Sequence, residues 1–137
     1  MDRAPVLQLA NLAVMRDWGL PAVKSVTLEV RAGEIVGVAG VSGNGQRELA
    51  EAIAGMRRTF DGTIRVGSSE ISNRLPTEVI AAGVAFIPEE RMTMGVVREF
   101  SVAENAILET HGRVPHARPM PGFAENPGMG LGACAGV

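Results

Sequence analysis

Two glycines frame a short loop whose residues could bind phosphate. Gly40 and Gly45 stand at the spacing of the phosphate-binding motif G-x-x-x-x-G-K-[ST], with Gly43 and Asn44 between them. In such a loop, glycines let successive backbone N–H groups converge on phosphate oxygens, and the N-terminus of the following helix adds positive potential. The spacing predicts a phosphate-binding loop; the alternative is an ordinary turn that joins a strand to a helix.

Gln46 and Arg47 stand where this motif has a Lys followed by a Ser or Thr. The Lys contributes charge to the β- and γ-phosphates, and the hydroxyl binds magnesium. Gln46 can donate hydrogen bonds without charge, whereas Arg47 carries charge but cannot ligate magnesium. Because losing one charge-assisted contact typically costs about 1.5–3 kcal/mol, we expect weak nucleotide binding and no fast hydrolysis. The residues expected to line the phosphates are Gly40, Gly43, Asn44, Gly45, Gln46 and Arg47.

The apolar pattern on both sides of the loop predicts the elements that position it. Residues 35–39 are apolar on both faces, as in a central strand that is covered on both sides. After the loop, apolar residues recur at the spacing of one helix face, with charged residues between them. The apolar positions are Leu49, Ala52, Ile53 and Met56, and the charged positions are Arg47, Glu48 and Glu51. A buried strand, a glycine loop and an amphipathic helix form the context that a phosphate-binding loop requires.

Strands with period-two alternation precede the loop. Residues 6–14 place Leu7, Leu9 and Ala13 at alternating positions, and residues 26–30 alternate cleanly between apolar and polar side chains. Residues 16–21 form a polar turn between them. The pattern predicts a half-buried antiparallel pair.

The segments after the loop helix predict shorter elements. We expect a turn at Asp61-Gly62, a strand at 63–66 and a buried strand at 84–87. Pro76 fits the first turn of a helix that runs to about Ala82, with Gly83 as its C-terminal cap. Ser101 is expected to cap a further short helix, with Glu104 at the capping-box position. Together these elements predict an α/β fold with an antiparallel β-subdomain.

Composition describes an ordinary globular chain. A net charge of −2 over 137 residues gives no general attraction to nucleic acid, and no apolar stretch approaches the ~18 residues of a membrane helix. The single cysteine, Cys134, cannot form an internal disulfide and fits a reducing cytoplasm. Residues 111–137 are rich in Gly and Pro without an apolar period, so we expect an irregular or disordered tail after a folded region at 1–110.

Two separated blocks resemble the ATP-binding-cassette (ABC) family. The first is VTLEVRAGEIVGVAGVSGNGQRELAEAIA at 26–54, and the second is GVAFIPEER at 83–91. The blocks are most similar to the second ATPase half of the tandem subunits that energise simple-sugar and nucleoside importers, where a Gly-x-Gly-Gln ending of the loop is typical. The resemblance implies a P-loop NTPase fold, ATP and Mg²⁺ as ligands, membrane permease subunits as partners, and a cytoplasmic location at the inner face of the cell membrane.

The resemblance also implies roles for two residues outside the loop. Glu89 matches the position after the apolar strand that lies near the magnesium and the attacking water; the alternative is that Glu89, Glu90 and Arg91 form a solvated charged turn. Trp18, the only tryptophan, lies near the place where the family stacks an aromatic ring on adenine. Its alternative role is a partial plug of the core.

Several parts of a working cassette do not appear in this sequence. There is no signature motif, no apolar run that ends in Asp-Glu, and no histidine after a strand, because His111 and His116 lie in the tail. We therefore name no catalytic residue and expect that catalysis requires a complete partner ATPase half. We hypothesise a frameshift or truncation near Arg113. The alternatives are a non-hydrolytic nucleotide-binding or structural half-domain and a gene fragment without function.

Overall fold

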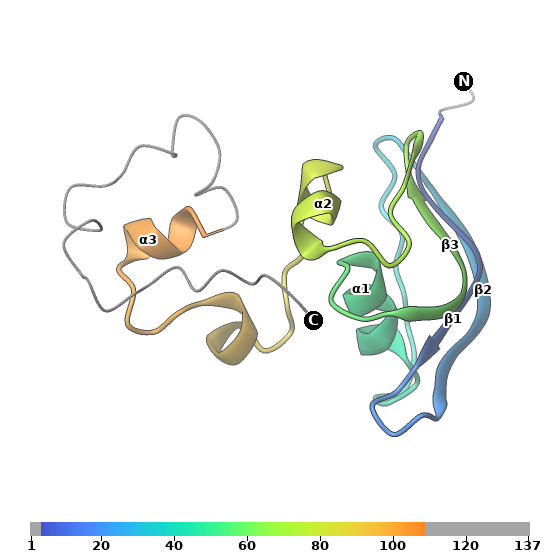
Figure 1. Ribbon diagram of the computed structural model, residues 1–137, viewed down its shortest axis with the longest axis horizontal. Coiled ribbons are helices and arrows are strands. Elements are labelled where there is room, and N and C mark those ends of the chain that lie inside the picture. Colours follow the sequence, from blue (N-terminus) through green and yellow to red (C-terminus); the bar gives the residue numbers. More distant parts are fainter. Residues whose placement is uncertain (1–3, 109–137) are drawn as a thin grey trace, which may run out of the picture. The chain divides into compact units, whose positions relative to one another are not determined.

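The computed structural model describes residues 4–108, and the chain divides after Pro88 into two compact units. The first unit holds a four-stranded antiparallel sheet in the order β2-β1-β3-β4, whose concave face packs on α1 (Figure 1). Its elements are β1 (Pro5–Met15), β2 (Pro21–Arg31), α1 (Gln46–Ile53), β3 (Thr59–Val66), β4 (Ser69–Glu70) and α2 (Pro76–Ala81). The described part of the second unit holds a π-helical turn, η1 (Arg91–Gly95), and α3 (Val102–Ala106).

The predicted antiparallel pair is confirmed in β1 and β2. Val26, Leu28 and Val30 are half-buried, while Thr27 and Glu29 between them are exposed. β2 begins at Pro21, earlier than expected, because two backbone bonds close the preceding turn within residues 16–20. These bonds join the Arg16 N–H to the Leu20 carbonyl (2.8 Å) and the Gly19 N–H to the Arg16 carbonyl (3.0 Å).

The three long strands, β1, β2 and β3, are irregular at one level of the sheet. Asn11, Ser25 and Gly62 all have positive φ, at 49°, 49° and 84°. The strand registers shift beside them, as at a β-bulge, which inserts a residue and bends its strand. The extra residue of β1 beside Asn11 also changes which alternate side chains of this strand face the core. Leu12 and Val14 are therefore fully buried, whereas Ala13, which we expected in line with Leu7 and Leu9, is only half-buried.

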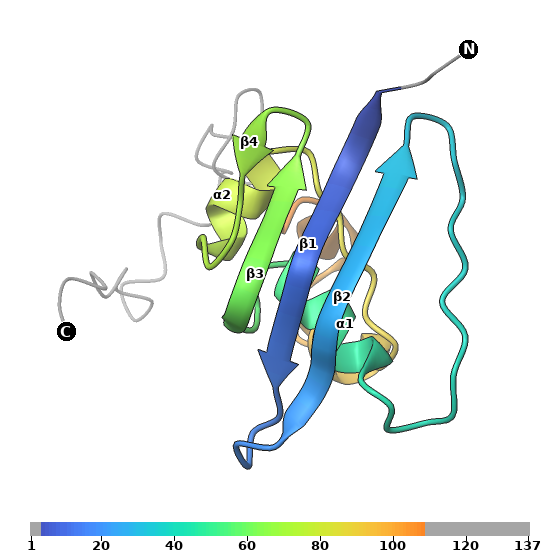
Figure 2. The ribbon, with the colours of Figure 1, turned by 90° about the vertical axis from the view of Figure 1, so that its right-hand side faces the viewer.

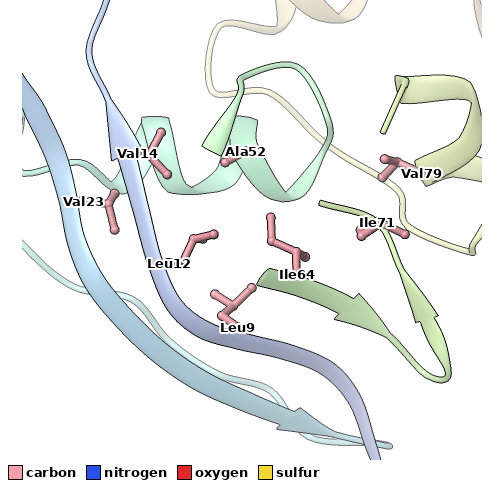
Figure 3. Packing of buried hydrophobic residues seen from close by; sticks show 8 residues of the cluster. All are labelled: Leu9, Leu12, Val14, Val23, Ala52, Ile64, Ile71 and Val79. Atoms are coloured by element: carbon pink, nitrogen blue, oxygen red, sulfur yellow. The ribbon is translucent and has the colours of Figure 1, made fainter. Parts of the chain in front are cut away.

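The core fills the concave side of the curved sheet. Aliphatic side chains from β1, β2 and β3 converge on Ala52 of α1, and Val79 of α2 closes one end beside Ile71 (Figure 3). The sheet residues of this cluster are Leu9, Leu12, Val14, Val23 and Ile64. Burial of these side chains places the N-terminal end of α1 next to the turn between β1 and β2.

Two predicted strands are wrong. Residues 35–39 and 84–87 carry no strand hydrogen bonding, and Figure 2 shows the connection from β2 to α1 as a long loop. Ile35 is 98% exposed, and Val38 and Ile87 are exposed as well. A strand requires a partner for its backbone groups. Within residues 4–108 no segment pairs with either of these stretches.

Two local predictions near α1 and β3 are also wrong. Asp61 and Gly62 lie inside β3 rather than in a turn, because a bulge accommodates the positive φ of Gly62 within the strand. α1 ends at Ile53, so Met56 lies beyond the helix and is exposed. Gly55, with φ 75°, is the residue that turns the chain after the helix.

The predicted ends of the later helices are confirmed. Pro76 is the first residue of α2, and Gly83 follows that helix with φ 97°. Ser101 caps α3: its hydroxyl accepts from the Glu104 N–H (3.3 Å), and the Glu104 carboxylate accepts from the Ser101 N–H (2.8 Å). Hydrogen bonds from the side chain and backbone of Ser101 lower the pKa of Glu104.

We predict that Gly62→Ala destabilises the first unit. A Cβ at this position would lie 2.5 Å from the carbonyl oxygens of both Ala10 and Asn11, in a backbone conformation that an L-residue avoids. The strain alone corresponds to about 1–3 kcal/mol, which urea unfolding would measure as a lower midpoint. Gly37→Ala is the matched control, because a Cβ there meets no atom within 4 Å. Equal urea midpoints for the two variants would contradict a requirement for glycine at position 62.

Candidate functional site: the glycine loop and its arginine clamps

The glycine loop joins the segment 35–39 to the start of α1. Gly43 and Gly45 have φ of 87° and 99°, and Gly45 is the N-cap of α1, with its carbonyl accepting from the Leu49 N–H (2.9 Å). A Cβ at Gly45 would lie 2.4 Å from the Ala22 carbonyl oxygen of β2. Glycine is therefore required where the end of the loop approaches β2. The first-turn N–H groups of an α-helix have no acceptor within the helix itself, and helix N-termini of this kind commonly bind anions.

Gln46 folds back over the first glycine of the loop. A Cβ added at Gly40 would lie 2.2 Å from Nε2 of the Gln46 side chain. The absence of a side chain at Gly40 therefore makes room for the Gln46 amide at the first helical position. This arrangement brings an uncharged donor to the place where the phosphate motif has its lysine.

Arg16, the first residue after β1, clamps the loop from the side of the hairpin. Its Nη2 donates a hydrogen bond to the carbonyl oxygen of Gly43. Its Nε lies 3.7 Å from Oε1 of Glu48 on α1, an ion-pair distance. The sequence pattern around Arg16 indicates only a polar turn and gives this residue no role. The contact ties the turn between β1 and β2 directly to the backbone of the glycine loop.

Glu51 is a buried carboxylate that joins two further arginines. Only 5% of this residue is exposed, although we had placed it on the polar side of the helix. Arg47 Nε donates to Glu51 Oε1 (2.7 Å), and Arg57 Nε donates to Glu51 Oε2 (2.8 Å). Burial is tolerated because each carboxylate oxygen receives a charge-assisted hydrogen bond. Arg47 therefore directs its Nε along the helix to Glu51.

Arg57 extends this network to the hairpin turn. Its Nη1 donates to the Met15 carbonyl oxygen (3.1 Å) and to Oδ1 of Asp17 (2.8 Å). One guanidinium thus contacts α1 through Glu51 and the end of β1 through two acceptors. The hairpin and the loop helix are held together by Arg16 on one side and Arg57 on the other.

The charges of this network reinforce one another. Burial by itself raises the pKa of Glu51, but the hydrogen bonds from Arg47 and Arg57 outweigh it and leave the pKa below its ordinary value. The hydrogen bond from Arg57 likewise lowers the pKa of Asp17. The same bonds raise the pKa of Arg57. Asp17, Glu51 and Arg57 are therefore charged near neutral pH.

Trp18 lies in the turn that these arginines hold. It follows Asp17 directly, and 90% of its surface is exposed. The alternative that Trp18 fills part of the core is therefore wrong. Its stacking on adenine stays a prediction, but the clamp of Arg16 on Gly43 places the tryptophan-bearing turn beside the loop.

Glu89 is exposed and belongs to the second unit, so its predicted approach to the loop stays a prediction. Its neighbours Glu90 and Arg91 are exposed too, which fits both interpretations of this segment. Within residues 4–108, no three side chains of the metal-binding types come together. Nor is any helix of this part long and apolar enough to span a membrane. His111, Arg113, His116 and Cys134 lie outside the described residues.

Most of the contacts made by Arg16, Arg47, Glu51 and Arg57 were not predicted from the sequence. The one available signal was the i, i+4 spacing of Arg47 and Glu51, which is typical of a helical ion pair. Arg16 and Arg57 contact partners 27 and 40 residues away, and no local pattern identifies such pairs.

A comparison of the sequence with protein-family models identifies the family of this chain. Residues 23–127 match the family described as ABC transporter. The chain belongs to the ABC transporter family. The match includes the loop, both wrongly predicted strands and Glu89, as the resemblance implied. The predicted boundary near residue 110 stays a prediction.

Three curated relatives share 40–45% of their aligned residues with this chain. The guanosine import ATP-binding protein NupO of Bacillus subtilis is 40% identical over 114 residues, which is 83% of this chain and 22% of NupO. The nucleoside import ATP-binding protein NupA of Lactococcus lactis is 41% identical over 113 residues, 82% of this chain and 22% of NupA. The glucose import ATP-binding protein TsgD13 of Haloferax volcanii is 45% identical over 105 residues, 77% of this chain and 19% of TsgD13. The chain spans about a fifth of the length of these relatives.

Solved structures confirm the P-loop NTPase fold of ABC type. A nucleotide-free ATP-binding cassette of an ABC transporter superposes with a TM-score of 0.55 at 22% identity. The superposition covers 58% of this chain and 31% of that cassette. The ADP conformation of the cassette MJ1267 gives the same values. The described part of this chain is thus a partial cassette dominated by the antiparallel β-subdomain.

We predict that Glu51→Gln destabilises the first unit by roughly 3 kcal/mol, because it removes the buried negative charge that pairs with both Arg47 and Arg57. Urea unfolding at pH 7 would measure the loss, with Glu29→Gln on the exposed face of β2 as the control.

The difference between the wild type and Glu51→Gln is also expected to depend on pH. The folded-state pKa of Glu51 lies below its ordinary value of 4.5. Its contribution is therefore fully present above that value and is lost as pH falls through the lowered pKa. The difference in free energy of unfolding between the two proteins should be smaller at pH 3 than at pH 7. An unchanged difference would contradict a stabilising charge on Glu51.

Proposed function

We propose that this chain forms part of the ATP-binding component of an ABC importer for simple sugars or nucleosides. The glycine loop that begins α1, clamped to the β-hairpin by Arg16, is the observation that carries the proposal. Its backbone conformation provides the donors that a nucleotide phosphate requires. The names of the relatives support the transport class, since all three are import ATP-binding proteins for nucleosides or a sugar.

The residues would hold ATP mainly through the backbone. The positive-φ glycines Gly43 and Gly45 shape the loop, and the first-turn N–H groups of α1 face the phosphates. Gln46 adds a neutral donor beside Gly40. Arg47 contributes positive charge near the helix start, although its Nε already bonds to Glu51. Trp18 presents an exposed aromatic ring on the adjoining turn.

The residues of the loop do not fit Mg²⁺. ABC cassettes in general bind the metal with the nucleotide, and the motif hydroxyl that ligates it is replaced by the guanidinium of Arg47. Glu89 is the one acidic candidate implied by the family, and it lies in the other unit. We therefore assign no catalytic residue and route no hydrolytic step through the metal in this chain.

The partners and location follow from the transport class. We infer that the protein docks on membrane permease subunits at the cytoplasmic face of the cell membrane. A complete ATPase half would supply the hydrolytic site. No nucleic-acid partner is proposed, because the net charge of −2 provides no electrostatic attraction to phosphate backbones.

We predict that the chain binds ATP saturably and releases no phosphate. Isothermal titration with ATP would measure binding, and a phosphate-release assay on the same sample would measure turnover. Binding without turnover supports a nucleotide-holding half-domain. Turnover would contradict the loss of catalytic residues, and absence of binding by a folded sample would contradict the proposal and favour a fragment without function.

We predict that Gln46→Lys raises ATP affinity about tenfold or more, because it restores one charge-assisted phosphate contact. Isothermal titration would measure the change, and the gain should shrink as salt concentration rises. Ser68→Lys is the control, since it adds the same charge at an exposed turn of the sheet. Equal gains in both variants would show a general charge effect and would contradict a lysine-accepting phosphate loop.

A further inference from the structure

The turn that carries Trp18 is closed by its own backbone hydrogen bonds. Contacts with other parts of the chain are needed to fix its orientation relative to the glycine loop. The bonds between Arg16 and Leu20 and between Gly19 and Arg16 close residues 16–20 into a compact turn. Neither bond connects the turn to the loop helix. An exposed ring on such a turn would sample many positions relative to the phosphate loop unless side chains fix it.

Arg57 supplies the contact on the helix side. It lies between α1 and β3, and only 17% of its side chain is exposed. Its Nε is held by the buried Glu51, so the guanidinium plane is oriented from within the unit. Its Nη1 then reaches both the Met15 carbonyl oxygen and the Asp17 carboxylate, on either side of Arg16. A planar fork with fixed donors can make these contacts at once, whereas a lysine ammonium is a point charge on a flexible stem.

We propose that Arg57 is a positioning residue for base recognition: it holds the Asp17–Trp18 turn so that the indole can stack on the base of a nucleotide whose phosphates occupy the glycine loop. The inference rests on the proposed function, because it assumes that nucleotide binds at the loop. Arg57 itself contacts the turn and Glu51, so its effect on the ligand runs through Trp18. Base stacking on an aromatic side chain typically changes affinity by roughly 5- to 100-fold.

The test compares ATP with inorganic tripolyphosphate, which carries the phosphates without the base. Isothermal titration of the full chain should give tighter binding of ATP than of tripolyphosphate. Arg57→Gln should lower ATP affinity about tenfold and leave tripolyphosphate affinity within about twofold. Arg57→Lys should recover part of the loss, and Arg74→Gln, which removes an exposed arginine on the approach to α2, should change neither ligand.

Asp17→Ala provides a second variant that keeps the buried ion pair intact. The Asp17 side chain is 80% exposed, so its removal leaves the Arg57–Glu51 contact in place. It should lose part of the preference for ATP without loss of thermal stability comparable to that of Arg57→Gln. Trp18→Ala should remove the preference, and Arg57→Gln added to it should cause no further loss of ATP affinity.

The outcomes separate the inference from the proposed function. Equal loss of ATP and tripolyphosphate in Arg57→Gln and Asp17→Ala would reduce Arg57 to a structural residue and overturn the inference alone. Equal affinity of the wild type for the two ligands would also overturn it and leave the phosphate loop standing. A folded wild-type chain that binds neither ligand would overturn both. Quenching of Trp18 fluorescence by ATP but not by tripolyphosphate would support the inference independently.

Discussion

A carboxylate buried between two guanidinium groups holds the parts of this site together. Glu51 lies on the inner face of α1, and its two oxygens pair with Arg47 at the start of the helix and with Arg57 after its end. A buried carboxylate without partners would carry a large desolvation cost, so both arginines must stay in place. Because Arg57 also binds the end of β1 and Asp17, the constraint reaches the hairpin turn. The geometry around the loop thus depends on one helical side chain.

The curvature of the sheet makes this arrangement possible. The positive-φ residues Asn11, Ser25 and Gly62 and the register shifts beside them bend three neighbouring strands at the same level. The bend turns Leu12 and Val14 toward α1, so a helix of two turns is covered from several sides by a small aliphatic core. A flat sheet of the same strands would leave the helix with fewer contacts. The same packing brings the start of α1 to the base of the hairpin.

The loop separates two contributions to phosphate binding that usually occur together. The backbone contribution requires only glycines of positive φ and a helix N-terminus, and both are present at Gly43, Gly45 and α1. The side-chain contribution requires a lysine and a hydroxyl, which are replaced by Gln46 and Arg47. A cradle of backbone dipoles remains electrostatically favourable to an anion without either side chain. This is the physical basis for expecting binding in a chain whose catalytic residues are not identified.

The sequence by itself determined the family, the loop, the alternation of β2 and the caps of α2 and α3. Each of these depends on residues close together in the chain: glycine spacing, a two-residue period, Pro76 before a helix, Ser101 three residues before Glu104. Only the tertiary structure decided whether 35–39 became a strand, because a strand exists only where another segment accepts its hydrogen bonds. It also decided that Glu51 is buried and that Arg16 and Arg57 clamp the hairpin. Those contacts join residues up to 42 positions apart, and the energy that selects them comes from packing that no local pattern encodes.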